Sequence, residues 1–383
     1  MWRPAFIIIY LLLLATVLLR SNQSFDREYA PSEIAGVSIG FHPGFRVWQN
    51  AKLLWQNGTL ERADYFAVSE YLRNGSISNT KENPVWQDLY AISVDGRFYP
   101  KHQQVITGIA ALCYGIFGDY GAWILNTLAL CILGISLYYL SGLFASPNSS
   151  LLLVMFLPWI EMEWIRYSIH SKNLVAFDMI GATFIIGGYA ISRVHPLIGG
   201  LLLGLSLNIR VSWTIYSSLP FASFLLSKRK SAYYTAGLAT TFLAVALFNY
   251  SLFGDPLRGP YSRLPHYIGG QLEIDTNSHT FSLYYLREIF QRLFSRDDGW
   301  ITSAPYLILV AIILAMKGVP PQLRRTCIAA MLLGAPHFIY GQWFNCSGTR
   351  FLMPTTLILS LPLAWALDRF LERKIGPAAQ AKV

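Results

Sequence analysis

The chain is organised as a series of long apolar runs separated by short polar segments. Several of these runs approach the ~20 residues that an α-helix needs to cross ~30 Å of hydrocarbon. They lack the strict polar/apolar alternation of a half-buried strand, so the pattern favours helices. The predicted spans are 5–19, 121–142, 150–167, 173–192, 197–209, 212–227, 232–252, 301–317, 326–342 and 350–368. The sequence therefore predicts an all-α polytopic membrane protein with about ten transmembrane helices.

The first apolar run, 5–19, lies between Arg3 and Arg20. A cleaved signal peptide would show a similar run. No clear small-residue cleavage site follows it, which favours a retained transmembrane anchor over residues 1–20. In both interpretations the chain from residue 21 onward lies outside the cytoplasm.

The polar, aromatic-rich segment that follows is too long for a simple connector. It holds two short amphipathic patterns, 47–56 and 63–73, which end at Asn57-Gly58 and Asn74-Gly75. Asn-Gly pairs after a helical pattern are typical of helix C-terminal stops. We expect residues 21–120 to form an outer loop with juxtamembrane helices.

Orientation follows from the basic clusters at the ends of the spans. Cytoplasmic loops carry an excess of Lys and Arg, which places Lys228–Lys230, the 318–325 turn and a tail over 369–383 on the cytoplasmic side. The parity holds only if 104–117 is a juxtamembrane or re-entrant helix instead of a full span. The loops at 168–172, 253–300 and 343–349 then share one outer side with 21–102, and residues 121–368 form the transmembrane bundle.

Composition agrees with the pattern and narrows the function classes. The chain is 54% hydrophobic and 13% charged, and its formal net charge is +9. A water-soluble domain has about a quarter charged residues. Because the clustered basic residues lie at span ends, they are membrane anchors, and we expect no nucleic-acid partner. The cysteines, which lack metal-ligand or disulfide-framework spacing, are expected to be core residues: Cys113, Cys131, Cys327 and Cys346.

Few acidic residues fall on the outer side, so each is a candidate for chemistry. Asp64 begins the second amphipathic pattern, where a carboxylate serves either as a helix N-cap or as a general base. Asp95 precedes Gly96, which predicts a tight turn. Lys101 and His102 close the loop at the membrane, where a lysine either snorkels or pairs with a lipid phosphate.

Further charged residues lie near or within the spans. Glu161 and Glu163 precede His170 and, with Arg166 and Lys172, form either interfacial ion pairs or the second wall of a charged pocket. Asp178 lies deeper in the following span, and Arg210, with Asn208, lies where the 197–209 and 212–227 helices are expected to join on the outer side. An unpaired charge at either place is costly and should face a partner or a cavity. From the residues alone, an enzyme and a transporter remain open.

Several segments, taken in order, resemble the integral-membrane glycosyltransferases of the GT-C type, in particular the bacterial branch related to protein O-mannosyltransferases and lipid A aminoarabinose transferases. The segments are 63–67 (ADYFA), 71–75 (YLRNG), 95–102 (DGRFYPKH), 200–210 (GLLLGLSLNIR), 249–258 (NYSLFGDPLR) and 348–354 (GTRFLMP). The chain departs from the family where Tyr65 replaces the second acid of a pair, where Gln103-Gln104 replaces prolines, and where Asn345–Ser347 replaces a Gly/Trp-rich run.

The resemblance implies a GT-C-like bundle that moves a sugar from a polyprenyl-phosphate donor to a glycan, lipid or protein acceptor, with inversion. It implies Asp64 as general base and, as ligands of the donor phosphate, Lys101, His102, Arg210 and Arg350. Glu161, Glu163, His170 and Asp178 are the acceptor-pocket candidates. It implies an active face that is periplasmic or extracellular at a bacterial inner membrane. No cofactor is assigned, and a divalent cation stays open, as do a lipid-sugar transporter or flippase and a non-catalytic envelope-assembly scaffold.

Overall fold

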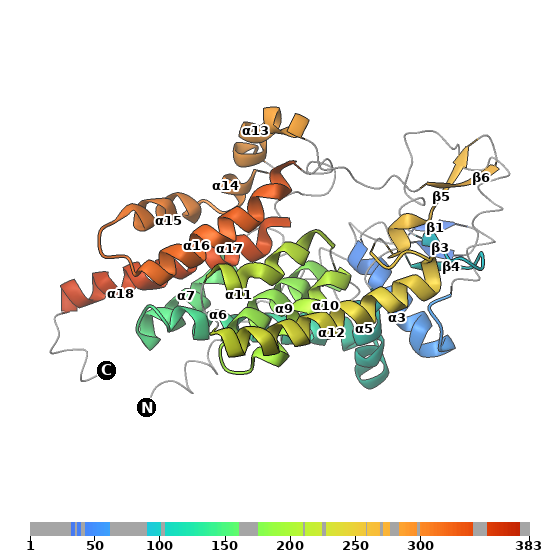
Figure 1. Ribbon diagram of the computed structural model, residues 1–383, viewed down its shortest axis with the longest axis horizontal. Helices are drawn as coiled ribbons and strands as arrows, with labels where there is room; N and C mark the ends of the chain where they lie inside the picture. Colours follow the sequence, from blue (N-terminus) through green and yellow to red (C-terminus); the bar gives the residue numbers. More distant parts are fainter. Residues whose placement is uncertain are drawn as a thin grey trace.

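The computed structural model describes residues 32–34, 37–39, 43–61, 90–100, 104–160, 175–209, 211–223, 227–257, 259–268, 271–275, 283–296, 299–339 and 351–375. The described chain is mostly helical, as expected, and its helices form an elongated bundle (Figure 1). The bundle helices are α6 (Gly121–Ser141), α7 (Pro147–Ile160), α9 (Phe177–Ile191), α10 (Pro196–Ile209), α12 (Lys228–Phe253), α15 (Tyr306–Ala315), α16 (Pro321–Gly334), α17 (Met353–Leu359) and α18 (Leu361–Ile375).

The expected count of about ten membrane-spanning helices is not reached. Among the described residues, two helical stretches are long and apolar enough to cross a bilayer, Gln104–Ser141 and Lys228–Phe253. Four further apolar helices are shorter, at Pro147–Phe156, Phe177–Ile191, Pro196–Ser206 and Tyr306–Ala315. The first predicted span, 5–19, lies outside the described residues.

Three predicted spans are broken into shorter pieces. The 212–227 run forms the 3-10 helix η2 (Val211–Ser218) and the short α11 (Leu219–Ala222). The 301–317 run divides into α14 (Trp300–Ser303) and α15, and the 350–368 run divides into α17 and α18. Pro220, Pro305, Pro354 and Pro362 lie at or just before the start of the pieces that follow. Proline lacks an N–H and clashes with the preceding turn, so it is tolerated at the start of a helix and breaks its interior.

The contacts between helices give their relative directions. Thr183 of α9 donates to the Ala129 carbonyl of α6, and Gly187 lies by Ser136, so these two helices run the same way. Gly181 faces Ile209 while Gly188 faces Gly199, so α10 returns antiparallel to α9.

The α10–α12 interface is built on small residues. A Cβ added at Gly200 would collide with the Tyr234 carbonyl of α12, and one at Gly237 with the Leu197 carbonyl of α10. Gly204 lies against Thr241 in the same way. The two backbones therefore touch along parallel helices. Helices pack through small residues in this way where the surroundings are as apolar as the helices themselves.

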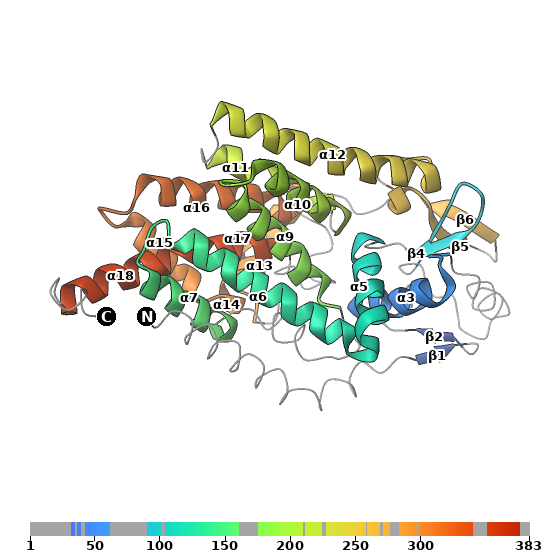
Figure 2. The same ribbon diagram turned by 90° about the horizontal axis from the view of Figure 1, so that it is seen from below.

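The bundle has two distinct ends. At the basic end, Lys230 donates to the Arg193 carbonyl, Arg324 to the Met316 carbonyl, and Ser149 to the Asp368 carboxylate. At the other end, here called the hairpin end, α3 (Pro43–Asn57), α5 (Gln104–Phe117) and the β-hairpins gather (Figures 1 and 2).

Antiparallel hairpins at this end were not predicted. They pair β1 (Ser32–Ile34) with β2 (Val37–Ile39), β3 (Tyr90–Ile92) with β4 (Phe98–Pro100), and β5 (Leu264–Ile268) with β6 (Gln271–Asp275). The predicted turn at Asp95-Gly96 is confirmed as the β3–β4 connection, with Gly96 at φ 81°. The predicted helix stop at Asn57-Gly58 is also confirmed, since α3 ends at Asn57 and Gly58 has φ 70°. The second amphipathic pattern, 63–73, lies outside the described residues.

Helix α5 is an element separate from α6. The 3-10 turn η1 (Gly118–Tyr120) divides them, and α5 crosses the end of the bundle while α6 runs along it (Figure 2). Trp48 of α3 packs edge-on against Tyr114 of α5, and Lys52 lies over both rings and pairs with Asp119. Aromatic and ionic contacts thus hold α3 against α5 and η1.

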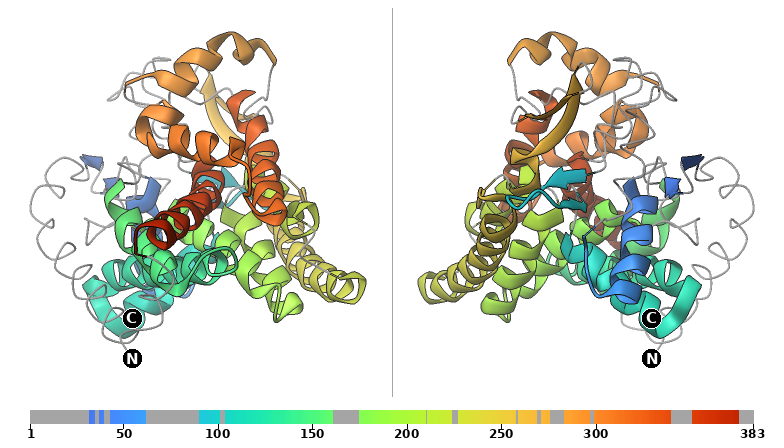
Figure 3. Two further views of the ribbon diagram at one scale, coloured as in Figure 1. Left: turned by 90° about the vertical axis from the view of Figure 1, so that its left-hand side faces the viewer. Right: turned by 90° about the vertical axis from the view of Figure 1, so that its right-hand side faces the viewer.

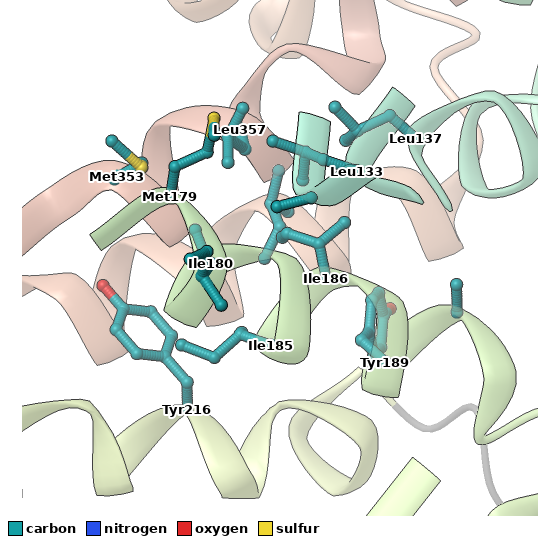
Figure 4. Close-up of a cluster of buried hydrophobic side chains, with 14 of the residues drawn as sticks. Leu133, Leu137, Met179, Ile180, Ile185, Ile186, Tyr189, Tyr216, Met353 and Leu357 are labelled. Carbon is teal, nitrogen blue, oxygen red and sulfur yellow. The ribbon is translucent and has the colours of Figure 1, made fainter. Parts of the chain in front are cut away.

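The main core fills the centre of the bundle, where α9 is surrounded by its neighbours. Figure 4 shows Met179, Ile180, Ile185, Ile186 and Tyr189 of α9 among buried side chains of α6, η2 and α17. Burial of such side chains contributes about 1.5–3 kcal/mol each relative to exposure in water. This core also includes buried residues of α3 and α5, so it extends to the hairpin end.

Candidate functional site

Most of the residues predicted to carry chemistry lie outside the described residues. They are Asp64, Lys101, His102, Glu161, Glu163, His170, Arg210 and Arg350. Asp178 is described. For Lys101, Arg210 and Arg350, the structure nevertheless describes residues immediately beside them in the chain. The site can therefore be built from these flanking residues.

The start of α5 is tied to the end of α10 by one amide side chain. The Val105 N–H donates to Asn208 Oδ1 at 2.8 Å, and Asn208 Nδ2 donates to Gln104 Oε1 at 3.4 Å. Gln104 Nε2 in turn donates to the Pro100 carbonyl at 3.1 Å. The first N–H groups of a helix have no partner within it, so Asn208 caps α5 from another helix. Pro100, Gln104, Val105 and Asn208 are thereby joined.

The segment after residue 210 is joined to the segment after residue 350. Trp213 is fully buried, and its Nε1–H donates to the Phe351 carbonyl at 3.0 Å. Gln104, Asn208, Trp213 and Phe351 together are called the helix-end junction below. It connects three segments of the chain: one that follows Lys101-His102, one that contains residues on both sides of Arg210, and one that follows Arg350.

A buried aromatic stack supports the junction. The His337 ring lies between Tyr216 and Phe351, at centroid distances of 6.0 and 6.3 Å and with nearly parallel planes. The Thr355 hydroxyl donates to the Ala330 carbonyl, so the Tyr216 hydroxyl, 2.7 Å from Thr355 Oγ1, is the donor to it. These contacts fix η2, η5 (Ala335–Ile339) and α17 relative to one another.

Asp178 lies beside the junction, in the first turn of α9, and is fully buried. It precedes Gly181 by three residues, so the two share one helix face, and a Cβ at Gly181 would meet Trp213 and Ile209. Asn126 of α6 holds the entry to the same helix by accepting the Ala176 N–H at 2.8 Å. A carboxylate in the first turn is favoured by the helix dipole. The structure thus places Asp178 on the face of α9 that packs against Ile209 and Trp213.

The β3–β4 hairpin, which precedes α5 in the chain, is bonded to the end of α12 and to the segment that follows it. The Ile92 N–H donates to the Arg263 carbonyl, and Arg263 Nε donates back to the Ile92 carbonyl at 2.8 Å. The Val94 N–H donates to the Leu252 carbonyl, and the Tyr99 ring packs edge-on against Phe253. The hairpin therefore packs on the C-terminal end of α12. Its second strand ends at Pro100, one residue before Lys101.

The turn of this hairpin carries a small charge network. Arg97 pairs with Glu61 at 3.0 Å and with Asp95 at 3.1 Å. A hydrogen bond from the Ser93 hydroxyl lowers the pKa of Asp95, and the Arg97 guanidinium lowers it further. Glu61 and then Asp95 raise the pKa of Arg97. Burial raises the pKa of the Tyr99 phenol. All three groups keep their ordinary charge at neutral pH.

Among the described residues, no three His, Cys, Asp or Glu side chains gather as a metal site would require. Cys113, Cys131 and Cys327 are free thiols, the last of them buried. Cys346 lies outside the described residues.

Sequence reasoning noted Asn208 and Gln104 as polar residues but gave them no role, and it did not single out Trp213, Tyr216 or His337. Their common signal is a polar or aromatic side chain inside or at the end of an apolar run, where a polar group must find a partner. That signal identifies side chains that need a hydrogen-bond partner, but it does not show which residue the partner is.

No protein-family model, curated protein or solved structure matches this chain.

Proposed function

We propose that this protein is a membrane glycosyltransferase of the GT-C type. It moves a sugar from a polyprenyl-phosphate donor to an acceptor hydroxyl, at the hairpin end of the bundle and on the outer face of a bacterial inner membrane. The helix-end junction is the observation that carries the proposal. Asn208 and Trp213 bring together chain segments that adjoin Lys101, Arg210 and Arg350, the cations that such a donor phosphate would need.

The surface of α12 supports the membrane placement. Only 22% of its most apolar stretch is buried, and it exposes large apolar side chains at Phe242, Leu243, Leu247 and Phe248. Exposed apolar surface of this extent marks a site of membrane or protein contact. The backbone-to-backbone packing of α10 on α12 and the basic residues at the opposite end agree with a polytopic membrane bundle.

The proposed reaction needs one base and a cluster of cations. Asp64 takes the proton of the acceptor hydroxyl while its oxygen attacks the anomeric carbon from the face opposite the phosphate. The bond between the anomeric carbon and the phosphate oxygen breaks, and the polyprenyl phosphate leaves with the bonding electron pair. Lys101 and His102, with Arg210 and Arg350, neutralise that phosphate. Fixed charges in a water-poor site are commonly the largest single contribution to such a step, and removal of one donor costs about 10²–10³-fold in turnover.

The test is release of polyprenyl phosphate from radiolabelled lipid-linked sugars by the protein in lipid nanodiscs, with envelope extract as acceptor source. Wild type is compared with Asp64→Asn and with Asp95→Asn, a matched loss of one loop carboxylate outside the proposed machinery. We expect release by wild type and Asp95→Asn and none by Asp64→Asn. Equal release by wild type and Asp64→Asn would remove Asp64 from the mechanism.

Two other outcomes would replace the proposal. Transport can be measured with the protein reconstituted into closed lipid vesicles. Movement of the intact lipid-linked sugar across that membrane, without release of polyprenyl phosphate, would identify a transporter or flippase. Neither release nor transport, with Asp64 and Lys101 tolerant of substitution, would identify an assembly scaffold.

A further inference from the structure

A helical run packed against η5, at the periphery of the bundle, presents its apolar side chains outward. It consists of η4 (Leu283–Glu288) followed directly by α13 (Ile289–Phe294). Four side chains along it are strongly exposed: Leu283 (72%), Leu286 (45%), Phe290 (75%) and Phe294 (51%). Spacings of three and four residues place them on one face. They are called the outer stripe here.

On the opposite face of the same run, a charged side chain, Arg292, is buried against the bundle. Arg292 is 1% exposed, pairs with Glu288 at 2.8 Å and donates through Nη1 to the Phe338 carbonyl of η5 at 2.8 Å. Its guanidinium also lies 4.9 Å from the centre of the Tyr285 ring. A helix that covers a soluble core has the reverse arrangement, with apolar residues inside and charges outside. The surroundings of the outer stripe are therefore expected to be apolar.

The edges of the outer stripe are cationic. Arg287 is exposed, with its guanidinium 3.4 Å from the centre of the Tyr284 ring, and Arg296 is exposed just beyond the end of α13. Glu288, the acid between them, is engaged by Arg292. Asp297 and Asp298 follow in the chain but lie outside the described residues. Apolar and aromatic side chains edged by arginines are typical of helices that lie in the headgroup region of a bilayer.

The position of the run fits that surface. The bond from Arg292 to Phe338 holds it against η5, whose His337 packs on the helix-end junction. In Figures 1 and 3, α13 stands clear of the bundle helices, at its periphery. A phospholipid leaflet is a partner that matches both the apolar stripe and its cationic edges.

We propose that η4 and α13 form an interfacial anchor that lies in a phospholipid leaflet on the side of the bundle where they pack against η5. The outer stripe enters the acyl boundary, and Arg287 and Arg296 pair with headgroup phosphates. This inference rests on the membrane placement proposed above, and it is independent of glycosyl transfer.

The test uses nanodiscs that contain a phospholipid with a photoreactive diazirine on its acyl chain, and peptide mapping by mass spectrometry. We expect adducts on the peptides that contain Leu286, Phe290 and Phe294, and on exposed residues of α12. Phe290→Asp should lower the adduct yield on α13 to that of an unilluminated sample. Gln291→Asp adds the same charge at an exposed position off the stripe and should leave the yield unchanged.

Adducts on α12 without adducts on α13 would overturn the anchor. Absence of adducts on both segments would overturn the anchor together with the membrane placement. Adducts on both, without release of polyprenyl phosphate, would leave the anchor in place and contradict only the proposed transferase activity.

Discussion

The basic end and the hairpin end close the same helices in two different ways. At the basic end the described connections are short turns, such as Gly142–Ser146 and Lys317–Pro320, and lysines or arginines bond to nearby carbonyl groups. At the hairpin end, side chains of one helix bond to the backbone of another: Asn208 to Val105, Asn126 to Ala176, and Trp213 to Phe351. The bonds from Lys230 and Arg324 at the first end are exposed, and the bond from Ser149 to the distant Asp368 is part-buried. At the second end, the bonds from Asn126 and Trp213 are buried.

The difference bears on where function lies. Short turns with exposed charges are enough to connect helices and orient them in a membrane. Buried side-chain bonds between distant segments are costly to leave half made, and they fix segments that the chain alone would leave independent. The hairpin end is therefore the end built for precise positioning. Substitutions there should lower activity as well as stability, whereas substitutions at the basic end should lower stability alone.

The largest expected effect is at the α10–α12 interface, which connects both ends. Gly200→Ala places a Cβ against the Tyr234 carbonyl, which cannot rotate away. Overpacking of this kind costs about 1–3 kcal/mol, so thermal unfolding in detergent should shift to lower temperature. Gly108→Ala in α5 meets no atom within 4 Å and should be neutral or stabilising, by up to about 1 kcal/mol. Equal effects of the two changes would contradict the close contact.

The next effect is at Asn208. Asn208→Leu removes the acceptor of the Val105 N–H, and an unsatisfied buried donor costs about 1–3 kcal/mol. Asn208→Asp keeps an acceptor oxygen at the same place and should retain more of the stability. We expect Asn208→Leu to lower both the melting temperature and the release of polyprenyl phosphate. A normal rate of release in a destabilised Asn208→Leu protein would show that the junction serves folding alone.

A paired substitution compares the two ends directly. Trp213→Phe removes the bond to the Phe351 carbonyl, and Ser149→Ala removes the bond to Asp368 at the basic end. Each change should cost about 1 kcal/mol of stability, measured by thermal unfolding. Only Trp213→Phe should reduce release of polyprenyl phosphate. The same fall in activity for both variants would remove the functional distinction between the ends.

Much of the helical framework could be predicted from the sequence because its signals are local. Apolar runs gave the positions of α6, α9, α10 and α12, and glycine after asparagine or aspartate gave the end of α3 and the β3–β4 turn. The breaks at Pro220 and Pro305 were missed because the apolar character continues across them. The hairpins were missed because strands of three to five residues leave little periodicity to detect.

The candidate site was less accessible to sequence reasoning. Asn208 and Val105 are 103 residues apart in the chain, and Trp213 and Phe351 are 138 apart. Nothing in the sequence pairs them, because each bond depends on how whole helices pack. The roles of Asp64, Lys101, His102, Arg210 and Arg350 came from family resemblance and stay predictions.

The smallest expected effect is at the hairpin turn. The lowered pKa of Asp95 means that its carboxylate contributes stability above the ordinary pKa of 3.8, and that this contribution is lost as pH falls below that value. Asp95→Asn should therefore speed amide hydrogen exchange in residues 90–100 at pH 7 and make less difference at about pH 3, where part of this contribution is lost. Asp119→Asn, which removes the partner of Lys52 on another element, should leave exchange in the hairpin unchanged. An effect of Asp95→Asn that is the same at both pH values would mean that the charge of Asp95 does not hold the turn, and that its docking on α12 relies on the backbone bonds from Val94 and Ile92.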